Sequence, residues 1–155
     1  MPIKTENKKL YPPNWRQISQ GVRERASYRC ENCRVRNYSV GYRDAAGQFH
    51  RLGGSGPCDC AGDGLVWPSL GLISYCEALE FAKAANTGSD GTDGDGHHYI
   101  VIVLTVAHLD HNPSNCHLSN LKALCQRCHL RYDIEHHKET AYQTRRKGKA
   151  MGELI

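Results

Sequence analysis

Two Cys-x-x-Cys pairs stand far apart in this chain, and histidines gather just before and directly after the second pair. Cys30 and Cys33 form the first pair, and Cys125 and Cys128 form the second. Four thiolates are the full tetrahedral ligand set of a closed structural zinc site, whereas a catalytic zinc keeps one position open. We therefore expect a structural zinc ion here, and any chemistry must come from neighbouring residues. These candidates are His108, Asp110, His111, Asn120 and His129.

The eight cysteines are an even number, which would also suit a disulfide framework in a secreted protein. The first residues lack the apolar segment of a secretory signal peptide, and no run of about 18 apolar residues occurs anywhere. Paired Cys-x-x-Cys knuckles in a reducing compartment are much more often metal sites than disulfides. We therefore predict a soluble cytoplasmic protein that binds zinc and has no membrane association.

The cysteines outside the two pairs carry no motif that assigns them a function. Cys58 and Cys60 form a Cys-x-Cys pair that could bind a second metal ion, but no matching pair accompanies it. Cys76 and Cys116 stand alone, and we expect both to be small buried or half-buried thiols.

The charge of the chain is distributed unevenly. The chain has 155 residues, a length that suits one domain, and its formal net charge is +4. Positive residues cluster in 16–36 and again in 138–149, whereas 59–95 is richer in acidic residues. Lysine and arginine contacts to phosphate supply most sequence-independent affinity for nucleic acid, so this pattern favours a polyanionic partner. We expect the 138–149 segment and Arg131 to contact phosphates.

Apolar periodicity and turn residues predict the elements that position these groups. Asn14 can cap a helix that begins near Trp15 and leads to the first knuckle, and Asn120 can begin a short strand that returns to the second knuckle. The remaining expectations are a hairpin over 38–50, a helix over 74–86, a flexible solvated connector over 87–96, one buried strand over 99–106 and a helix from Cys128 onward.

With this order of elements, residues 103–133 resemble the HNH endonuclease motif of the ββα-metal superfamily. The resemblance is carried by Asp110-His111, Asn120-Leu121 and Leu124-Cys125-x-x-Cys128-His129, with Cys30 and Cys33 as the upstream half of the zinc site. It implies an α+β fold with a zinc-bound ββα-metal core and a Gly/Asp-rich insert. The single domain 1–155 then divides into 14–36 (helix and first knuckle), 37–98 (insert), 99–137 (core) and 138–155 (basic tail).

The resemblance also implies an activity and a role for each site residue. His111 would be the general base of a DNA endonuclease, because an imidazole with a pKa near 6.5 is partly neutral at cellular pH. Asp110 and His129 would hold a catalytic Mg²⁺ or Mn²⁺ ion, and Asn120 would hold the loop that carries the base. Asp133 lies one helical turn beyond His129 and is a further candidate ligand. Proteins of this kind are common in phages, which suggests a bacterial or phage-infected cell.

Several alternatives stay open at this stage. His108 could be the base in place of His111, but it follows Ala107, which cannot bind metal. The same fold could serve a non-catalytic zinc-ribbon protein that binds DNA, or an interaction module whose insert makes the contacts. A single active site cuts both strands only by sequential nicks or as a dimer, which allows a homodimer.

Overall fold

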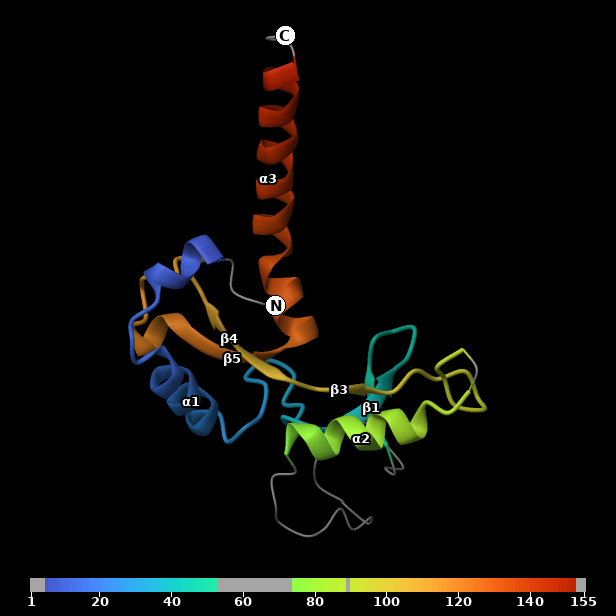
Figure 1. Ribbon diagram of the computed structural model, residues 1–155. Coiled ribbons are helices and arrows are strands. Elements are labelled where there is room, and N and C mark those ends of the chain that lie inside the picture. The colour runs from blue at the N-terminus through green and yellow to red at the C-terminus, as the bar shows by residue number, and fades with distance from the viewer. Residues whose placement is uncertain (1–4, 53–73, 89, 153–155) are drawn as a thin grey trace.

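The computed structural model describes residues 5–52, 74–88 and 90–152, and the protein combines helices and strands in an α+β fold (Figure 1). Cys58 and Cys60 lie outside the described residues. In chain order the elements are the 3-10 helix η1 Thr5–Leu10, α1 Trp15–Arg25, β1 Val40–Arg43, β2 Phe49–Arg51, α2 Tyr75–Ala85, β3 Ile100–Val101, β4 Leu104–His108, the 3-10 helix η2 Leu118–Asn120, β5 Leu121–Cys125 and α3 Gln126–Gly152.

The part of the molecule that carries the candidate site is a two-stranded sheet between two helices. β4 and β5 are antiparallel, with Leu104 opposite Cys125 and His108 opposite Leu121. Val22 of α1 is fully buried and packs in one cluster with Leu121 of β5. The short strand predicted from Asn120 is therefore confirmed as β5, which runs directly into α3 (Figure 1).

The insert builds a second, smaller layer. β1 pairs with β2 and β3 in a three-stranded antiparallel sheet, and α2 packs on it through Ala78 and Ala82 against Val40. Ser74 caps α2: its hydroxyl accepts a hydrogen bond from the backbone N–H of Glu77, whose carboxylate accepts one from the backbone of Ser74. The hairpin predicted over 38–50 and the helix predicted over 74–86 are both confirmed.

The single strand predicted over 99–106 is wrong, because this apolar run divides between the two sheets. β3 ends at Val101 and β4 begins at Leu104. Between them Ile102 is fully buried, and side chains from other elements bond the nearby backbone: Val103 N–H donates to Gln126 Oε1 (3.1 Å), and Leu104 N–H donates to Asn37 Oδ1 (2.8 Å). The chain can therefore pass from one sheet to the other without leaving these backbone N–H groups unpaired.

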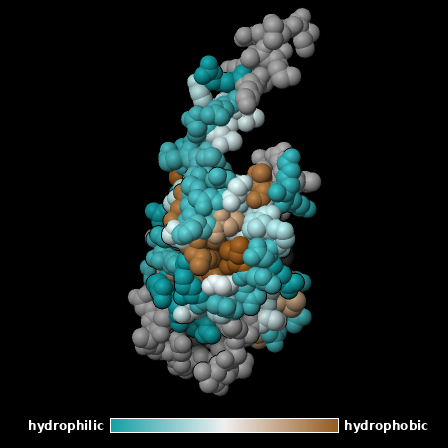
Figure 2. Space-filling view, turned by 90° about the vertical axis from the view of Figure 1, so that its left-hand side faces the viewer, coloured by the Kyte–Doolittle hydropathy of each residue, from teal (hydrophilic) through white to brown (hydrophobic). Residues whose placement is uncertain are grey.

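The two outer helices differ from expectation at their ends. α1 begins at Trp15 as predicted, but the Asn14 side chain forms no capping hydrogen bond. α3 begins at Gln126, two residues before Cys128, and continues to Gly152, so 138–152 is helix and not a fraying tail. Figure 2 shows that the projecting half of α3 is mostly hydrophilic, with hydrophobic residues gathered on the body below it. Among the described residues, no helix is long and apolar enough to cross a membrane.

Candidate functional site

The two cysteine pairs meet at one point, as the sequence predicts. The Sγ atoms of Cys30, Cys33, Cys125 and Cys128 all lie within 4.8 Å of one another, and those of Cys33 and Cys125 are 3.6 Å apart. This four-cysteine cluster could hold a structural metal ion such as zinc. All six cysteines in the described residues are free thiols, which removes the disulfide alternative for them.

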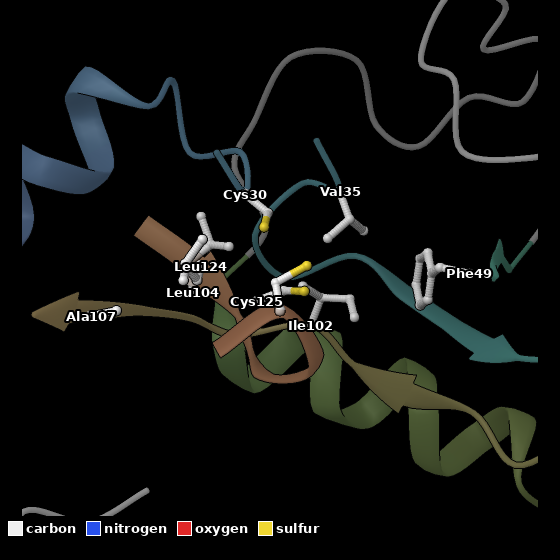
Figure 3. Packing of buried hydrophobic residues seen from close by; sticks show 9 residues of the cluster. Cys30, Val35, Phe49, Ile102, Leu104, Ala107, Leu124 and Cys125 are labelled. Atoms are coloured by element: carbon white, nitrogen blue, oxygen red, sulfur yellow. The ribbon is translucent and has the colours of Figure 1, made fainter. Parts of the chain in front are cut away.

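Local backbone bonds and a buried core hold the four-cysteine cluster in shape. The first knuckle closes through Cys30 N–H donating to Val35 O (2.8 Å) and Arg34 N–H donating to Cys30 O (2.9 Å). Glu31 then ties this knuckle to β5, because its N–H donates to Ala123 O and its carboxylate accepts from Ala123 N–H (2.9 and 2.6 Å). Figure 3 shows how apolar side chains surround the cysteines: Val35, Phe49, Ile102, Leu104, Ala107 and Leu124.

Two polar groups lie beside the sulfur atoms and would stabilise thiolates there. Asn32 Nδ2 donates to Cys128 Sγ (3.3 Å), and the Arg43 guanidinium donates to Cys125 Sγ (3.8 Å). Hydrogen bonds among the thiols lower the pKa of Cys30 but raise the pKa of Cys33 and raise that of Cys125 to about 11, so the thiols do not all ionise together. Donors of this kind offset part of the negative charge that four thiolates bring together.

A second group of titratable side chains surrounds the carboxylate of Asp133 on α3. Asp133 is only 7% exposed. Its Oδ2 lies 3.2 Å from Nε2 of His129 and 3.9 Å from Nε2 of His137, and its Oδ1 lies 3.4 Å from Nδ1 of His111. We call these four residues the Asp133 cluster. It is more open than the four-cysteine cluster, because no three of its ligand atoms lie within 4.8 Å of one another.

A hydroxyl on β4 holds the ring of His129 in place. Thr105 Oγ1 lies 2.7 Å from Nδ1 of His129 and 3.3 Å from Leu124 O. Burial lowers the pKa of His129, which favours the neutral imidazole, although the Asp133 charge acts in the opposite direction. With Nδ1 beside Thr105, the ring turns Nε2 towards the Asp133 carboxylate.

His111 reaches Asp133 from the loop after β4 through an unusual backbone conformation. Its φ is +55°, in the left-handed region that costs a non-glycine residue roughly 1 kcal/mol. Its ring stacks on that of His136 with centroids 4.3 Å apart and lies 5.4 Å from that of Tyr132. The Tyr132 hydroxyl donates to Leu109 O, which ties the same loop to α3.

His108 lies apart from the Asp133 cluster, against α1. Its ring stacks on Trp15 with centroids 5.2 Å apart and meets the edge of Tyr11 at 5.7 Å, and its Nε2 is 3.7 Å from Cys116 Sγ. Burial lowers the pKa of His108, so the imidazole is neutral near pH 7.

The carboxylate of Asp110 is occupied by its own loop. It accepts hydrogen bonds from Asn120 Nδ2 (2.8 Å), Asn115 Nδ2 (2.7 Å) and Asn112 N–H (2.9 Å), and these bonds lower its pKa to about 2. Asn120 also accepts from Asp110 N–H (3.1 Å), so it fastens the loop as expected. Within the described residues no hydrogen bond or ion pair joins Asp110 to His129, and the carboxylate beside His129 is that of Asp133.

Sequence reasoning missed Thr105 and His137 and misjudged one thiol. A four-residue spacing from His129 through Asp133 to His137 is visible in the sequence and is the signal that would have found His137. Thr105 gives no such signal. Cys116 is half-buried as predicted, but Cys76 is exposed.

The end of the 87–96 connector and the residue after it form a third cluster, which consists of Asp93, Asp95 and His97. The Asp93 carboxylate already accepts hydrogen bonds from the backbone N–H groups of Asp95 and His97 (3.0 and 2.8 Å). The carboxylate therefore shapes a turn. Among the described residues, no hydrogen bond or ion pair joins this cluster to the Asp133 cluster.

Comparison with protein-family models, with curated proteins and with solved structures found no match to this chain. The functional interpretation therefore depends on the residues and their geometry.

Proposed function

We propose that this protein is a DNA endonuclease of the HNH type, which hydrolyses phosphodiester bonds with one metal ion and a histidine general base. The observation that carries the proposal is the Asp133 cluster, where a buried carboxylate faces imidazoles of α3 and of the β4–β5 loop. Supporting it is the element order strand, strand, helix, with the four-cysteine cluster at the junction of β5 and α3.

The chemistry of the donors fits a catalytic ion. Phosphodiester hydrolysis needs an activated water and positive charge beside the phosphate, and a divalent ion supplies that charge when bound. Nε2 of His129 stands 3.2 Å from the Asp133 carboxylate, so these two residues would hold the ion. We assign this role to Asp133 in preference to Asp110, whose oxygens are already engaged by Asn115 and Asn120.

The protein's own residues would position and deprotonate the attacking water. His108 ends β4 and His111 lies in the loop after it, and either imidazole would take a proton from the water as the water oxygen bonds to phosphorus. The bond from phosphorus to the 3′ oxygen would break, and that oxygen would take up a proton from solvent, which leaves a 5′-phosphate and a 3′-hydroxyl. Asn120 would be a positioning residue, because its side chain bonds the backbone of the loop that carries His111.

The projecting half of α3 would provide a surface that contacts the DNA backbone. Residues 138–152 extend about 22 Å at the helical rise of 1.5 Å per residue. Lys138, Arg145 and Arg131 lie roughly 120–160° around the helix axis from Asp133. These side chains would therefore contact the flanking backbone of a duplex, and not the scissile phosphate.

Nicking of supercoiled plasmid by the zinc-loaded protein, with and without a divalent ion, tests the proposal. We expect metal-dependent nicking by the wild type and by Cys76→Ser, whose thiol is exposed on α2. His111→Ala and His108→Ala should each lose roughly 10²-fold or more, the usual effect of a positioned proton-transfer group. A wild-type protein that binds plasmid, branched and single-stranded DNA but cuts none of them would contradict the proposal and favour a zinc-ribbon DNA-binding protein.

A further inference from the structure

We propose that His111 and His137 join His129 and Asp133 around one ion, and that this donor set selects a transition-metal ion over Mg²⁺. The inference rests on the proposed function for what the ion does, but the binding of the ion is a separate property.

The first step is the regular spacing of the candidate ligands along α3. His129, Asp133 and His137 follow one another at intervals of four residues. Since each interval turns about 40° around the helix beyond a full turn, the three side chains share one face. His129 and His137 approach the same oxygen, Oδ2 of Asp133, each with its Nε2 atom.

The second step is the spacing of the donor atoms. Ligands on an ion with bonds of about 2.1 Å stand roughly 3.0–3.4 Å from their neighbours. His129 and His111 stand at 3.2 and 3.4 Å from different oxygens of Asp133, so each pair has this spacing. No three of the donor atoms lie within 4.8 Å of one another, so an ion would draw the imidazoles closer together around the carboxylate. His137 stands at 3.9 Å, and half of its side chain is exposed, which leaves it free to turn inward.

The third step is the convergence of three imidazoles on one carboxylate. Asp133 is 7% exposed, and three histidine nitrogens approach its oxygens within 4 Å without a hydrogen bond of acceptable geometry in the described part of the chain. Thr105 Oγ1 stands 2.7 Å from Nδ1 of His129 and holds that ring with Nε2 towards Asp133. A cation between the carboxylate and these nitrogens would bind both kinds of donor.

The fourth step is the chemistry of the donors. Three imidazole nitrogens and one carboxylate suit Zn²⁺, Co²⁺, Ni²⁺ or Mn²⁺, whereas Mg²⁺ prefers oxygen ligands and retains several waters. The Mg²⁺ expected from the sequence resemblance therefore does not fit this donor set. With His111 committed as a ligand, the role of general base passes to His108, which is outside the cluster and neutral.

Titration of the full-length protein, loaded with one equivalent of Zn²⁺ to fill only the four-cysteine cluster, with Co²⁺ tests the inference without any assay of cleavage. Binding is followed by visible absorbance and by calorimetry. We expect the wild type and His117→Gln, an exposed histidine elsewhere, to bind one Co²⁺ beyond the zinc. Asp133→Asn should lose this binding, and His137→Gln and His111→Asn should each weaken it at least tenfold. A hundredfold excess of Mg²⁺ should not displace the Co²⁺.

Two results would overturn the inference: wild-type affinity for Co²⁺ in both histidine variants, or displacement of Co²⁺ by Mg²⁺ at similar concentration. Unchanged zinc content and thermal unfolding in each variant separate the loss of a ligand from misfolding. Co²⁺ binding as expected by a protein that cuts no DNA would reject the endonuclease proposal and leave the ligand assignment standing.

Discussion

The four-cysteine cluster and the Asp133 cluster both lie where the β4–β5 sheet meets α3, yet they differ in closure. Three of the four cysteines are buried and all four sulfur atoms lie within 4.8 Å. The Asp133 cluster has a buried carboxylate, but the side chains of His111 and His137 are 28% and 50% exposed. A closed ligand set holds a structural ion, whereas an open one lets water and substrate reach the ion.

The difference also separates what each cluster does for the fold. The sulfur atoms join the first knuckle to β5 across more than 90 residues, so an ion there would stabilise the whole arrangement. The Asp133 cluster joins residues of one helix and the adjacent loop, which other contacts already hold together, such as the bond from Tyr132 to Leu109. Damage to the first cluster should unfold the protein, and damage to the second should remove only metal binding and activity.

The largest expected effect comes from Cys125→Ser. The apparent binding free energy of structural zinc is about 10–16 kcal/mol, which exceeds the whole stability of many domains. The variant should lose its zinc and its cooperative thermal unfolding, measured by metal analysis and circular dichroism. Cys76→Ser is the matched control and should retain both. Full zinc content and an unchanged Tm in Cys125→Ser would show that the two clusters do not differ as described.

An intermediate effect is expected from Thr105→Val, which removes the hydroxyl beside Nδ1 of His129 but keeps the shape of the side chain. Loss of a group that orients a metal ligand typically weakens metal affinity 10–100-fold. Co²⁺ affinity should fall by this factor while zinc content stays the same, and Thr105→Ser should restore most of the affinity. Equal Co²⁺ affinity in the valine variant would show that Thr105 does not orient His129 for metal binding.

The smallest expected effect concerns the pH dependence of stability. Burial against Trp15 and Tyr11 lowers the pKa of His108, although the Asp110 charge acts in the opposite direction. In the unfolded chain His108 takes up a proton near pH 6.5, whereas in the folded protein it stays neutral to a lower pH. Its contribution to the free energy of unfolding is therefore complete above pH 6.5 and is lost as the pH falls below that value. The free energy of unfolding should therefore fall between pH 7.5 and 5.5.

His108→Phe keeps a ring beside Trp15 but cannot take up a proton. Its free energy of unfolding should decline less than that of the wild type over the same pH interval, measured by urea denaturation of the zinc-loaded proteins. The lowered pKa of His129 leaves a residual slope in both proteins. Identical pH profiles would mean that His108 is not held neutral by its surroundings.

The four-cysteine cluster was predictable because its signal is local and chemically specific. Cys30 and Cys33, like Cys125 and Cys128, have the spacing of a zinc knuckle, and tetrahedral coordination requires the two pairs to meet. The strand returning to Cys125 and the helix after it follow from the same constraint. Sequence and structure agree in these parts of the fold, as they do for the hairpin over 38–50 and the helix over 74–86.

The Asp133 cluster was only partly predictable, because nearby amides compete for the carboxylates. Asp110 precedes His111 and resembles a ligand, but Asn115 and Asn120 fold back onto it and engage its oxygens. Asp133 becomes the carboxylate of the cluster because Thr105, on another element, turns His129 towards it. The division of the predicted strand over 99–106 has a similar cause, since its partners come from distant parts of the chain.

The central claim is that one chain carries a closed structural metal centre and an open catalytic one. Anomalous X-ray scattering from crystals of the zinc-loaded protein soaked in Mn²⁺, measured at the absorption edges of both metals, tests it most directly. The account predicts a zinc peak among the four cysteine sulfurs and a manganese peak between Asp133 and His129. A manganese peak at Asp93 and Asp95 alone, or no zinc among the sulfurs, would contradict it.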